Sequence, residues 1–445
     1  MVRGYNQRFN REYNRSLLLT LIRDSGQISR SELARKTQLS KPVIGEIIDE
    51  LIQSDLIAEG QKGLSQQGRK PILLRLNRGS KFVVGIDLAR EHVELIITDL
   101  SGKLEQRIIQ PWTLEGLLRP SFAQEILYTV REVIRQAGIS TEKILGIGIA
   151  HPFPLSHSNR ILVSENDQAG WDTIHLREFI QAQLQVPVFQ ENDANVAALY
   201  EQWYGCAREF EHFLFVLVGN GVGSGLIVDG NVYRGADGMA GEIGHMTIDK
   251  HGPVCKCGRR GCLEALVSIP RLVESFRVRS AKKDHGGAAT CGVPAAPRGY
   301  DDVCAAVAAA DPVAMQLLQD MVDDLAVGIA SMVNVMNPQA VVVGGEIAKL
   351  GNNLGELLAS AVRRNAPPLF ANRCRTVLSR YDESLVAKGA AMLVLKHFFR
   401  FPQQYIPKLN GGVMRDEGVT EGDENESGRT RTKRLDNGLS NSWAY

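Results

Sequence analysis

Four potential metal ligands lie close together between Gly244 and Glu264, in the segment GHMTIDKHGPVCKCGRRGCLE. These ligands are His245, Cys255, Cys257 and Cys262. Three thiolates and one neutral imidazole form a set that closes a tetrahedral structural zinc site. The alternative is that they are unconnected residues of one loop, but their tight spacing favours a structural Zn²⁺ site.

The composition is that of a globular protein of 445 residues, with 44% hydrophobic and 23% charged residues. This length suffices for two or three domains. No apolar run approaches the roughly 20 residues that a membrane span needs, and the polar N-terminus lacks the apolar core of a signal peptide. The cysteines outside the loop are scattered, as in a reducing compartment. We therefore expect a cytoplasmic protein with no membrane partner.

The charge is distributed unevenly along the chain. Residues 1–80 hold 14 Lys and Arg against 8 Asp and Glu, a net charge of +6, whereas the remainder holds 37 against 42, a net charge of −5. Further arginines lie near the N-terminus: Arg3, Arg8, Arg11 and Arg15. A basic front end on a mildly acidic body predicts that the front end meets a polyanion.

Apolar spacing in this front end predicts helices over residues 14–24, 30–36 and 40–54. Ser29 and Glu32 form a capping box ahead of the second helix. The pattern resembles a helix-turn-helix, whose last helix enters the major groove of DNA.

Ser40 is the expected cap of the third helix, and Gln38 occupies the turn position that is often glycine. Two short strands follow, over 56–59 and 71–76, and the loop between them reads as a basic wing. The residues expected to contact DNA are Ser40, Lys41, Gly45 and Glu46 on the helix and Lys62, Arg69 and Lys70 on the wing. The alternative is a small helical bundle with solvated charges.

From Lys81 onward, short apolar strand-like runs alternate with helical stretches. This alternation predicts an α/β body of sheets covered by helices, and its size predicts two lobes with a cleft between them. The first two runs suit a hairpin. The helical stretches cover residues 121–137, 173–184, 193–204, 312–335 and 383–399.

The chain resembles the ROK family of repressors, open reading frames and sugar kinases over about residues 15–400. The motifs that carry the resemblance are ENDAN (Glu191–Asn195), VGNGVGSG (Val218–Gly225), AGEIGH (Ala240–His245), the cysteine run Cys255–Glu264 and NPQAVVVGGEI (Asn337–Ile347). It implies a winged helix-turn-helix domain over 1–78 and a two-lobed, actin-like sugar-kinase fold over 79–400. The zinc loop is expected at about 245–264, and residues 401–445 read as a disordered tail.

The resemblance also assigns roles to particular residues. Those matching the family's sugar ligands are Asn192, Asp193, Glu242, His245 and Glu264. Carboxylates, an amide and an imidazole supply the donors and acceptors that a polyol needs. Asn192 and Asp193 also suit the N-terminal cap of the helix that follows them.

Kinases of this family carry Asp-x-Gly-Gly-Thr after the first strand of the body, where the matching segment here is Asp87-Leu88-Ala89-Arg90-Glu91. Both glycines and the hydroxyl are missing, so a regulator that binds sugar without phosphorylating it is favoured. The alternative is an active ATP-dependent sugar kinase with Asp193 orienting or deprotonating the attacking hydroxyl.

The expected partners are a double-stranded DNA operator and a sugar or sugar phosphate, bound by a homodimer or a dimer of dimers. A protein of a sugar-transport system remains a further possible input. Two segments depart from the family: residues 280–300, expected to form a loop, and HPFPLS (His151–Ser156), where the family has Pro-Gly.

Overall fold

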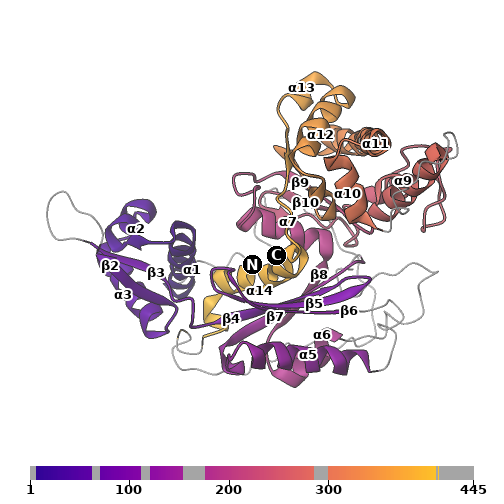
Figure 1. Ribbon diagram of the computed structural model, residues 1–445. Helices are drawn as coiled ribbons and strands as arrows, with labels where there is room; N and C mark the ends of the chain where they lie inside the picture. Colours follow the sequence, from indigo (N-terminus) through magenta and orange to yellow (C-terminus); the bar gives the residue numbers. More distant parts are fainter. Residues whose placement is uncertain are drawn as a thin grey trace, which may run out of the picture.

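The computed structural model has a small N-terminal head beside a larger body of two lobes (Figure 1). The structure describes residues 7–62, 71–111, 121–153, 176–284, 299–406 and 409, without the side chains of residues 7, 8, 61, 62, 282–284 and 352. Within these ranges, no helix is long and apolar enough to cross a membrane.

The head consists of three helices and a three-stranded sheet of order β1-β3-β2, which is consistent with the predicted winged helix-turn-helix. Its elements are α1 (Gln7–Ser25), β1 (Ile28–Ser29), α2 (Arg30–Thr37), α3 (Lys41–Gln53), β2 (Ile57–Lys62) and β3 (Ile72–Leu76). The helices bury their apolar faces together, including Leu18, Ile22, Leu33, Ile44 and Ile48. The first helix begins earlier than its apolar spacing predicted.

Local capping in the head agrees with the sequence in part. The Ser29 hydroxyl accepts from the Glu32 amide at 3.2 Å, and a Glu32 carboxylate oxygen accepts from the Ser29 amide at 3.0 Å, which confirms the capping box. Gln38 has a φ of 58°, in the left-handed region where glycine is favoured. Ser40 is the N-cap residue of α3, as predicted, although its side chain makes no capping hydrogen bond within the described part of the chain.

Two of the N-terminal arginines are engaged inside the head. The Arg15 guanidinium donates to Glu50 at 2.9 Å and is only 3% exposed, and Arg11 pairs with the same carboxylate. Their charges therefore help to join α1 to α3, which corrects the expectation that they add to the polyanion-binding charge.

The first lobe of the body is a five-stranded sheet of order β6-β5-β4-β7-β8. Its elements are β4 (Phe82–Leu88), β5 (His92–Asp99), β6 (Leu104–Pro111), α5 (Phe122–Gln136), β7 (Ile144–His151), α6 (Leu176–Leu184) and β8 (Val188–Asn192). The predicted hairpin is confirmed, because β4 and β5 pair antiparallel. Helices α5 and α6 lie on one side of this sheet and α14 (Leu385–Arg400) on the other (Figure 1).

The second lobe is a five-stranded sheet of order β11-β10-β9-β12-β13 with its own helices. Its strands are β9 (Phe213–Val218), β10 (Val222–Val228), β11 (Asn231–Val232), β12 (Ala340–Gly344) and β13 (Arg375–Leu378). Its helices are α8 (Leu263–Val267), α9 (Ile269–Asp284), α10 (Tyr300–Ala308), α11 (Pro312–Met336), α12 (Asn352–Asn365) and α13 (Pro368–Ala371). The chain crosses from the first lobe through α7 (Asp193–Trp203) and returns through α14.

Two segment predictions need correction. Helix α9 continues to Asp284 and α10 begins at Tyr300, so the first residues of the predicted 280–300 loop are helical. The chain also stays ordered beyond residue 400, because Ile406 and Leu409 are buried against the apolar core. Residues 285–298 and 410–445 lie outside the described residues.

Helices α7 and α14 occupy the centre of the body and contact each other at backbone distance. A Cβ on Gly389 of α14 would lie 2.3 Å from the Val196 carbonyl oxygen of α7. A Cβ on Gly148 of β7 would lie 1.8 Å from the Ala390 carbonyl oxygen of α14. The absence of a side chain at these glycines therefore allows both helices to pack closely between the two sheets.

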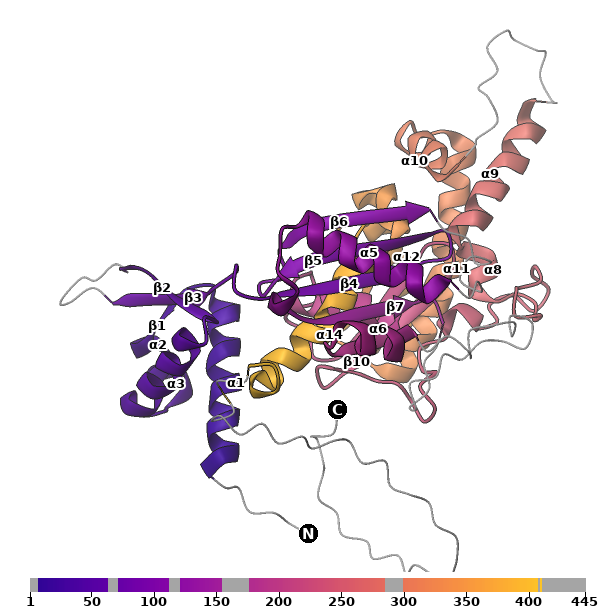
Figure 2. The same cartoon turned by 90° about the horizontal axis from the view of Figure 1, so that it is seen from below.

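The head is joined to the body where α1 meets the C-terminal ends of α7 and α14. The Arg23 guanidinium lies 3.8 Å from the ring centroid of Trp203 and 4.8 Å from that of Phe399. The Ser16 hydroxyl donates to the Phe399 carbonyl at 2.7 Å. Figure 2 shows α1 beside the end of α14 from a second direction.

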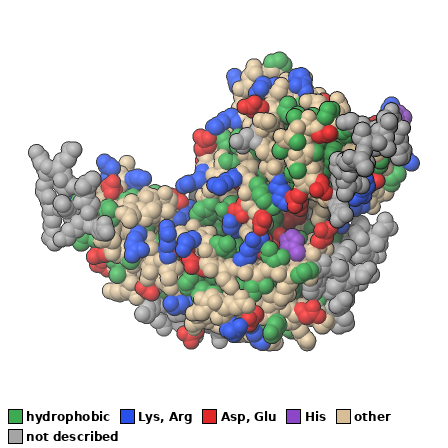
Figure 3. Space-filling view, viewed as in Figure 1, with side chains coloured by type: hydrophobic (Ala, Val, Ile, Leu, Met, Phe, Trp, Pro, Cys, Tyr) green, Lys and Arg blue, Asp and Glu red, His purple; other side chains and the backbone are tan. Residues whose placement is uncertain are grey.

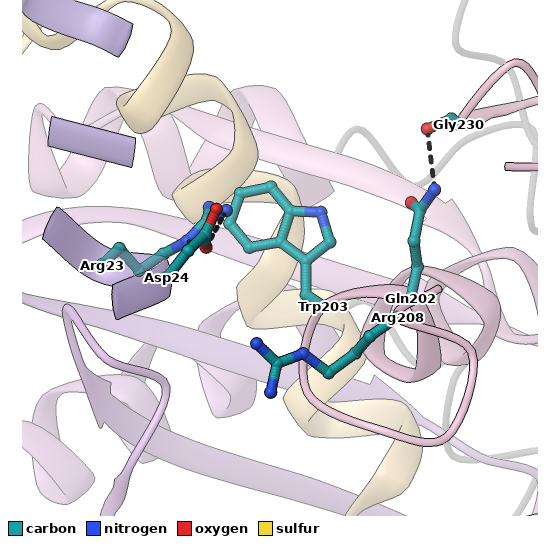
Figure 4. A pocket seen from close by; sticks show the side chains of 6 residues that line it. All are labelled: Arg23, Asp24, Gln202, Trp203, Arg208 and Gly230. Carbon is teal, nitrogen blue, oxygen red and sulfur yellow. Dashed lines mark hydrogen bonds and ion pairs between the residues drawn. The ribbon is translucent and has the colours of Figure 1, made fainter. Parts of the chain in front are cut away.

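A pocket of about 320 Å³ opens at this junction and is lined by both parts of the chain (Figure 4). Its lining residues are Arg23, Asp24, Gln202, Trp203, Arg208 and Gly230. It lies at the opposite end of α7 from Asp193, so it is separate from the predicted sugar-binding residues.

Replacing Gly148 with alanine should destabilise the body, because the new methyl group would strike the α14 backbone. We expect the free energy of unfolding to fall by about 1–3 kcal/mol or more, measured by urea denaturation. Gly45→Ala is the matched control, since a Cβ there meets nothing within 4 Å. That control should stabilise α3 by about 0.5–1 kcal/mol. Equal stability of Gly148→Ala and the unmodified protein would contradict this packing.

Candidate functional site

The AGEIGH segment is held against strand β10 by two close glycine contacts. A Cβ on Gly241, whose φ is 96°, would lie 2.4 Å from the Ser224 carbonyl oxygen. A Cβ on Gly244 would lie 2.0 Å from the Val222 carbonyl oxygen. The Ser224 hydroxyl also donates to the Gly241 carbonyl at 2.7 Å. These contacts bring Glu242 to the cleft between the lobes.

Three carboxylates from separate parts of the sequence converge at this place. Asp193 is the first residue of α7, and the side chain of Asn192 caps that helix by accepting from the Ala194 amide at 3.0 Å. Glu264, in the first turn of α8, accepts from the Val222 amide at 3.2 Å. Glu242 lies close enough to interact electrostatically with both Asp193 and Glu264. Acidic side chains gather in the hollow between the two lobes (Figure 3).

The carboxylates hold their protons more tightly than they would in water. Burial raises the pKa of Asp193 to about 6, although the Ala194 amide and the Arg90 charge act in the opposite direction. Burial, with the charges of Asp193 and Glu264, raises the pKa of Glu242 to about 7. The Glu242 side chain is exposed to solvent in the open cleft, so water screens part of this effect. At neutral pH the site presents both hydrogen-bond donors and acceptors.

The structure brings the four predicted metal ligands together. One ligand atom from each of His245, Cys255, Cys257 and Cys262 lies within 4.8 Å of the others. Cys257 Sγ lies 3.6 Å from Cys262 Sγ, and Cys255 Sγ lies 3.7 Å from His245 Nδ1. Ligands bound tetrahedrally at about 2.3 Å from a metal are about 3.8 Å apart, so these separations fit such a metal.

The loop around this cluster depends on glycine. Gly261 has a φ of 68°, and a Cβ there would lie 1.5 Å from the Asp249 carbonyl oxygen.

Although burial acts to raise the pKa of Cys257, hydrogen bonds from Arg259 and from the other two thiols lower it to about 7. A thiol that loses its proton near neutral pH favours metal binding.

The predicted sugar and metal sets share His245. Its Nδ1 faces Cys255. The other predicted sugar-binding residues interact with one another: Asp193 with Asn192, and Glu242 with both Asp193 and Glu264. The shared residue places the cysteine loop beside the carboxylates, because η4 (Ile243–His245) contains it and follows Glu242 directly.

The predicted DNA-binding residues are only partly described. Ser40, Lys41 and Glu46 are exposed on α3, and a Cβ on Gly45 would meet nothing within 4 Å. The Lys62 side chain and the whole of Arg69 and Lys70 lie outside the described residues.

Sequence reasoning missed several charged residues that belong to these surfaces. Arg35 and Lys36 are exposed at the end of α2, next to the turn into α3. In the cleft, Arg234 pairs with the buried Glu191 carboxylate, with Nε at 2.8 Å. From the sequence, Arg90 was considered only as a replacement for a glycine of the kinase motif. In the structure its charge acts to lower the pKa of Asp193. The signal for Arg35 and Lys36 was available, because basic residues near a recognition helix are a usual feature of DNA-binding heads.

Of the segment His151–Ser156, which departs from the Pro-Gly pattern, the structure describes residues 151–153, in the first lobe. His151 is fully buried, and burial lowers its pKa to about 4, although the charge of Glu191 and a backbone hydrogen bond with Phe153 act in the opposite direction. Phe153 is 6% exposed and belongs to the core under the sheet, and the Arg90 guanidinium lies 5.7 Å from its ring centroid. The larger side chains at this segment are thus accommodated by the core.

Comparison with known proteins gives consistent matches over most of the chain. The model of the ROK family matches residues 83–397. A putative xylose repressor from Caldicellulosiruptor sp. (strain Rt8B.4) is 30% identical over 401 residues, which cover 89% of this chain and 99% of the relative.

Two solved structures match different shares of this chain. The crystal structure of a ROK family transcriptional regulator, a homolog of the E. coli MLC protein, has a TM-score of 0.73 at 25% identity and covers 91% of this chain and 100% of its own. A ROK hexokinase from Thermus thermophilus has a TM-score of 0.55 at 28% identity and covers 71% of this chain and 99% of its own.

Replacing Asp193 with asparagine should stabilise the protein at neutral pH. The native pKa of about 6 lies above the value of 3.8 for an unperturbed aspartate, so the cost of ionising this group appears above pH 3.8 and is complete above pH 6. We expect Asp193→Asn to raise the free energy of unfolding by about 1–3 kcal/mol at pH 7.5, and by less at pH 4.5.

Urea denaturation at both pH values measures this difference. Asp237→Asn, an exposed carboxylate, is the control and should change stability by less than about 0.5 kcal/mol. An identical effect of Asp193→Asn at the two pH values would contradict the raised pKa.

Proposed function

The chain belongs to the ROK family, and from this premise we propose that it is a sugar-responsive transcriptional regulator, acting as a repressor. In this proposal the head binds DNA and the cleft of the body binds a sugar without phosphorylating it. The second candidate is an ATP-dependent sugar kinase. It is supported by the structural similarity of the body to a ROK hexokinase.

The observation that carries the proposal is the extent of the two structural matches. The regulator aligns with 91% of this chain, whereas the hexokinase aligns with 71%. The winged head precedes the 83–397 family match, so it is an addition to a sugar-kinase-like body. A DNA-binding head on such a body is the arrangement that a regulator needs.

In the head, the exposed start of α3 is the surface we propose for base contacts. Lys41 lies in its first turn, and Arg35 and Lys36 lie beside it at the end of α2. Cations near the start of a recognition helix neutralise phosphates on either side of the major groove. We propose that two such heads in a homodimer bind a roughly palindromic operator.

In the cleft, the charges favour a neutral sugar over a sugar phosphate. Asp193, Glu242 and Glu264 surround the place where hydroxyl groups would bind, and their charges repel a phosphate. Carboxylates, the Asn192 amide and the His245 imidazole supply matched acceptors and donors for hydroxyls. A pentose such as xylose is the first candidate, because a relative over 89% of the chain is named a putative xylose repressor.

We propose that the chain does not phosphorylate the sugar because the hairpin between β4 and β5 lacks the residues of the kinase motif. In place of the glycines and hydroxyl of family kinases it has Ala89, Arg90 and Glu91. The Arg90 side chain is directed towards Asp193 and Phe153 instead of leaving bare backbone for phosphates. Glu91 adds a negative charge that opposes a nucleotide.

We further propose that His245, Cys255, Cys257 and Cys262 hold a structural Zn²⁺. Thiolates select zinc among the common divalent ions, and the separations fit a tetrahedral ion. Bound zinc would supply no chemistry beyond fixing the loop. The loop in turn positions Glu242 and Glu264 for the sugar, since both flank the ligands in sequence.

Helix α7 provides a route between the two binding events. Its first residue is Asp193 in the cleft, and its last is Trp203 against Arg23 of the head. An 11-residue helix is about 16 Å long and moves as one unit. A shift of Asp193 on sugar binding would therefore be passed to the head.

Thermal melting of the purified protein against sugars tests the proposal against the kinase alternative. A ligand that binds only the native state raises the melting temperature by mass action. We expect a rise with one neutral sugar, and no further rise or sugar phosphorylation when ATP and magnesium are added. ATP-dependent sugar phosphorylation that is lost in Asp193→Asn would establish the kinase instead. No change in melting temperature with any of the sugars would favour a protein partner.

Replacing Cys257 with serine should remove most of the bound zinc, because one of four ligands is lost. Metal analysis of the purified protein measures zinc per chain, and limited proteolysis measures loosening of the loop. Cys374→Ser, outside the cluster, is the matched control and should keep its zinc. Full zinc content and unchanged sugar affinity in Cys257→Ser would refute the zinc assignment.

A further inference from the structure

A second cluster of potential metal ligands lies in the first lobe, apart from the cysteine loop. It consists of Asp87, His92 and Glu94, each of which offers a ligand atom within 4.8 Å of the others. Asp87 and Glu94 face each other directly across the β4–β5 hairpin. His92 lies two residues before Glu94 on the same strand, so all three side chains project from one face of the sheet.

This face of the sheet packs against α14. Gly85, two residues before Asp87, lies on the same face, where a Cβ would strike the Ala387 carbonyl oxygen of α14. Asp87 also interacts electrostatically with Asp193, which directly follows β8 of the same sheet. The cluster therefore lies next to the candidate sugar site but uses different residues.

Both carboxylates are buried, yet their hydrogen bonding is incomplete. Glu94 is 1% exposed, and its Oε1 accepts from Arg107 Nε at 2.6 Å and from Ser384 Oγ at 2.5 Å. Its Oε2 is buried, and no described residue forms a hydrogen bond with it. Asp87 is 8% exposed, and in the described part of the chain no hydrogen-bond donor reaches its carboxylate.

The local charge is negative. Burial raises the pKa of Asp87 well above its usual value, and the charges of Asp193 and Glu94 add to this effect. Two arginines of this region interact with other carboxylates as well, since Arg107 pairs with Glu94 and Glu383 and Arg90 acts on Asp193. Buried negative charge without donors requires either a proton or a cation.

We propose that Asp87, His92 and Glu94 bind a divalent cation of the class that accepts both carboxylate and imidazole ligands, such as Mn²⁺. Two carboxylates with one imidazole differ from the thiolate set of the cysteine loop, so the two sites select different ions. Arg107 and Ser384 hold Oε1 of Glu94 and leave Oε2 for the ion, as outer hydrogen bonds do at metal sites.

The half-buried position of His92 leaves one side of the site open. Three protein ligands do not complete the six positions that such a cation usually fills. Water or a ligand in the cleft would occupy the remaining positions. The site thus ties the two strands of the β4–β5 hairpin together.

Electron paramagnetic resonance of Mn²⁺ tests the proposal on the full-length, zinc-loaded protein, because free Mn²⁺ loses its signal on binding. We expect one Mn²⁺ per chain, with affinity lowered at least about tenfold in both His92→Gln and Glu94→Gln. Glu91→Gln, an exposed carboxylate of the same hairpin, is the matched control and should bind normally. Cys257→Ser should also keep its Mn²⁺.

Two outcomes would overturn the site. One is the absence of stoichiometric Mn²⁺ binding, which would mean that Asp87 is simply protonated. The other is equal affinity in His92→Gln and Glu91→Gln. Glu94→Gln also loses its pairing with Arg107 and could fold poorly, whereas His92→Gln keeps both carboxylates and decides the question. Mn²⁺ should raise the melting temperature of the unmodified protein and of Glu91→Gln, but not of His92→Gln.

Discussion

The architecture depends on the close approach of two central helices, α7 and α14, to each other and to the sheets on either side. Gly389 lets α14 touch the Val196 carbonyl of α7, and Gly148 lets β7 touch the Ala390 carbonyl of α14. Protein interiors are packed as densely as organic crystals, so elements in such contact shift together. Helix α7 therefore contacts α14, and its two ends lie at the predicted sugar-binding residues and at the head. In the proposed function, this one helix would connect the two binding events.

The contact between head and body combines a shared apolar cluster with a cation–π contact. Arg23 lies between Trp203 and Phe399, and such cation–π contacts contribute about 0.5–2 kcal/mol. Coupling free energies between sites in proteins are of a similar size, about 1–3 kcal/mol. In the proposed function, sugar at Asp193 and DNA at the head would influence each other through α7. By the same linkage, a sugar that weakens DNA binding must bind more weakly to the DNA-bound protein.

Local patterns in the sequence predicted the elements well, because helices and caps depend on near neighbours. The capping box at Ser29 and the β4–β5 hairpin are examples. Features that depend on distant residues were not predictable in this way. The burial of Arg15 depends on Glu50 of another helix, and the Asp87–Glu94 pair depends on strand register. The cysteine cluster was predicted because its ligands are close in sequence, whereas the carboxylates of the cleft required the family resemblance.

The most direct test of the account is the affinity of the protein for DNA upstream of its own gene, measured by fluorescence anisotropy at a fixed, stated salt concentration with and without the sugar that raises its melting temperature. Salt must be fixed because phosphate contacts make affinity steeply salt-dependent. The account predicts that the sugar changes DNA affinity in the unmodified protein. It also predicts that Trp203→Ala still binds both sugar and DNA but loses most of the coupling between them. A sugar that binds tightly yet leaves DNA affinity unchanged in the unmodified protein would contradict the central claim.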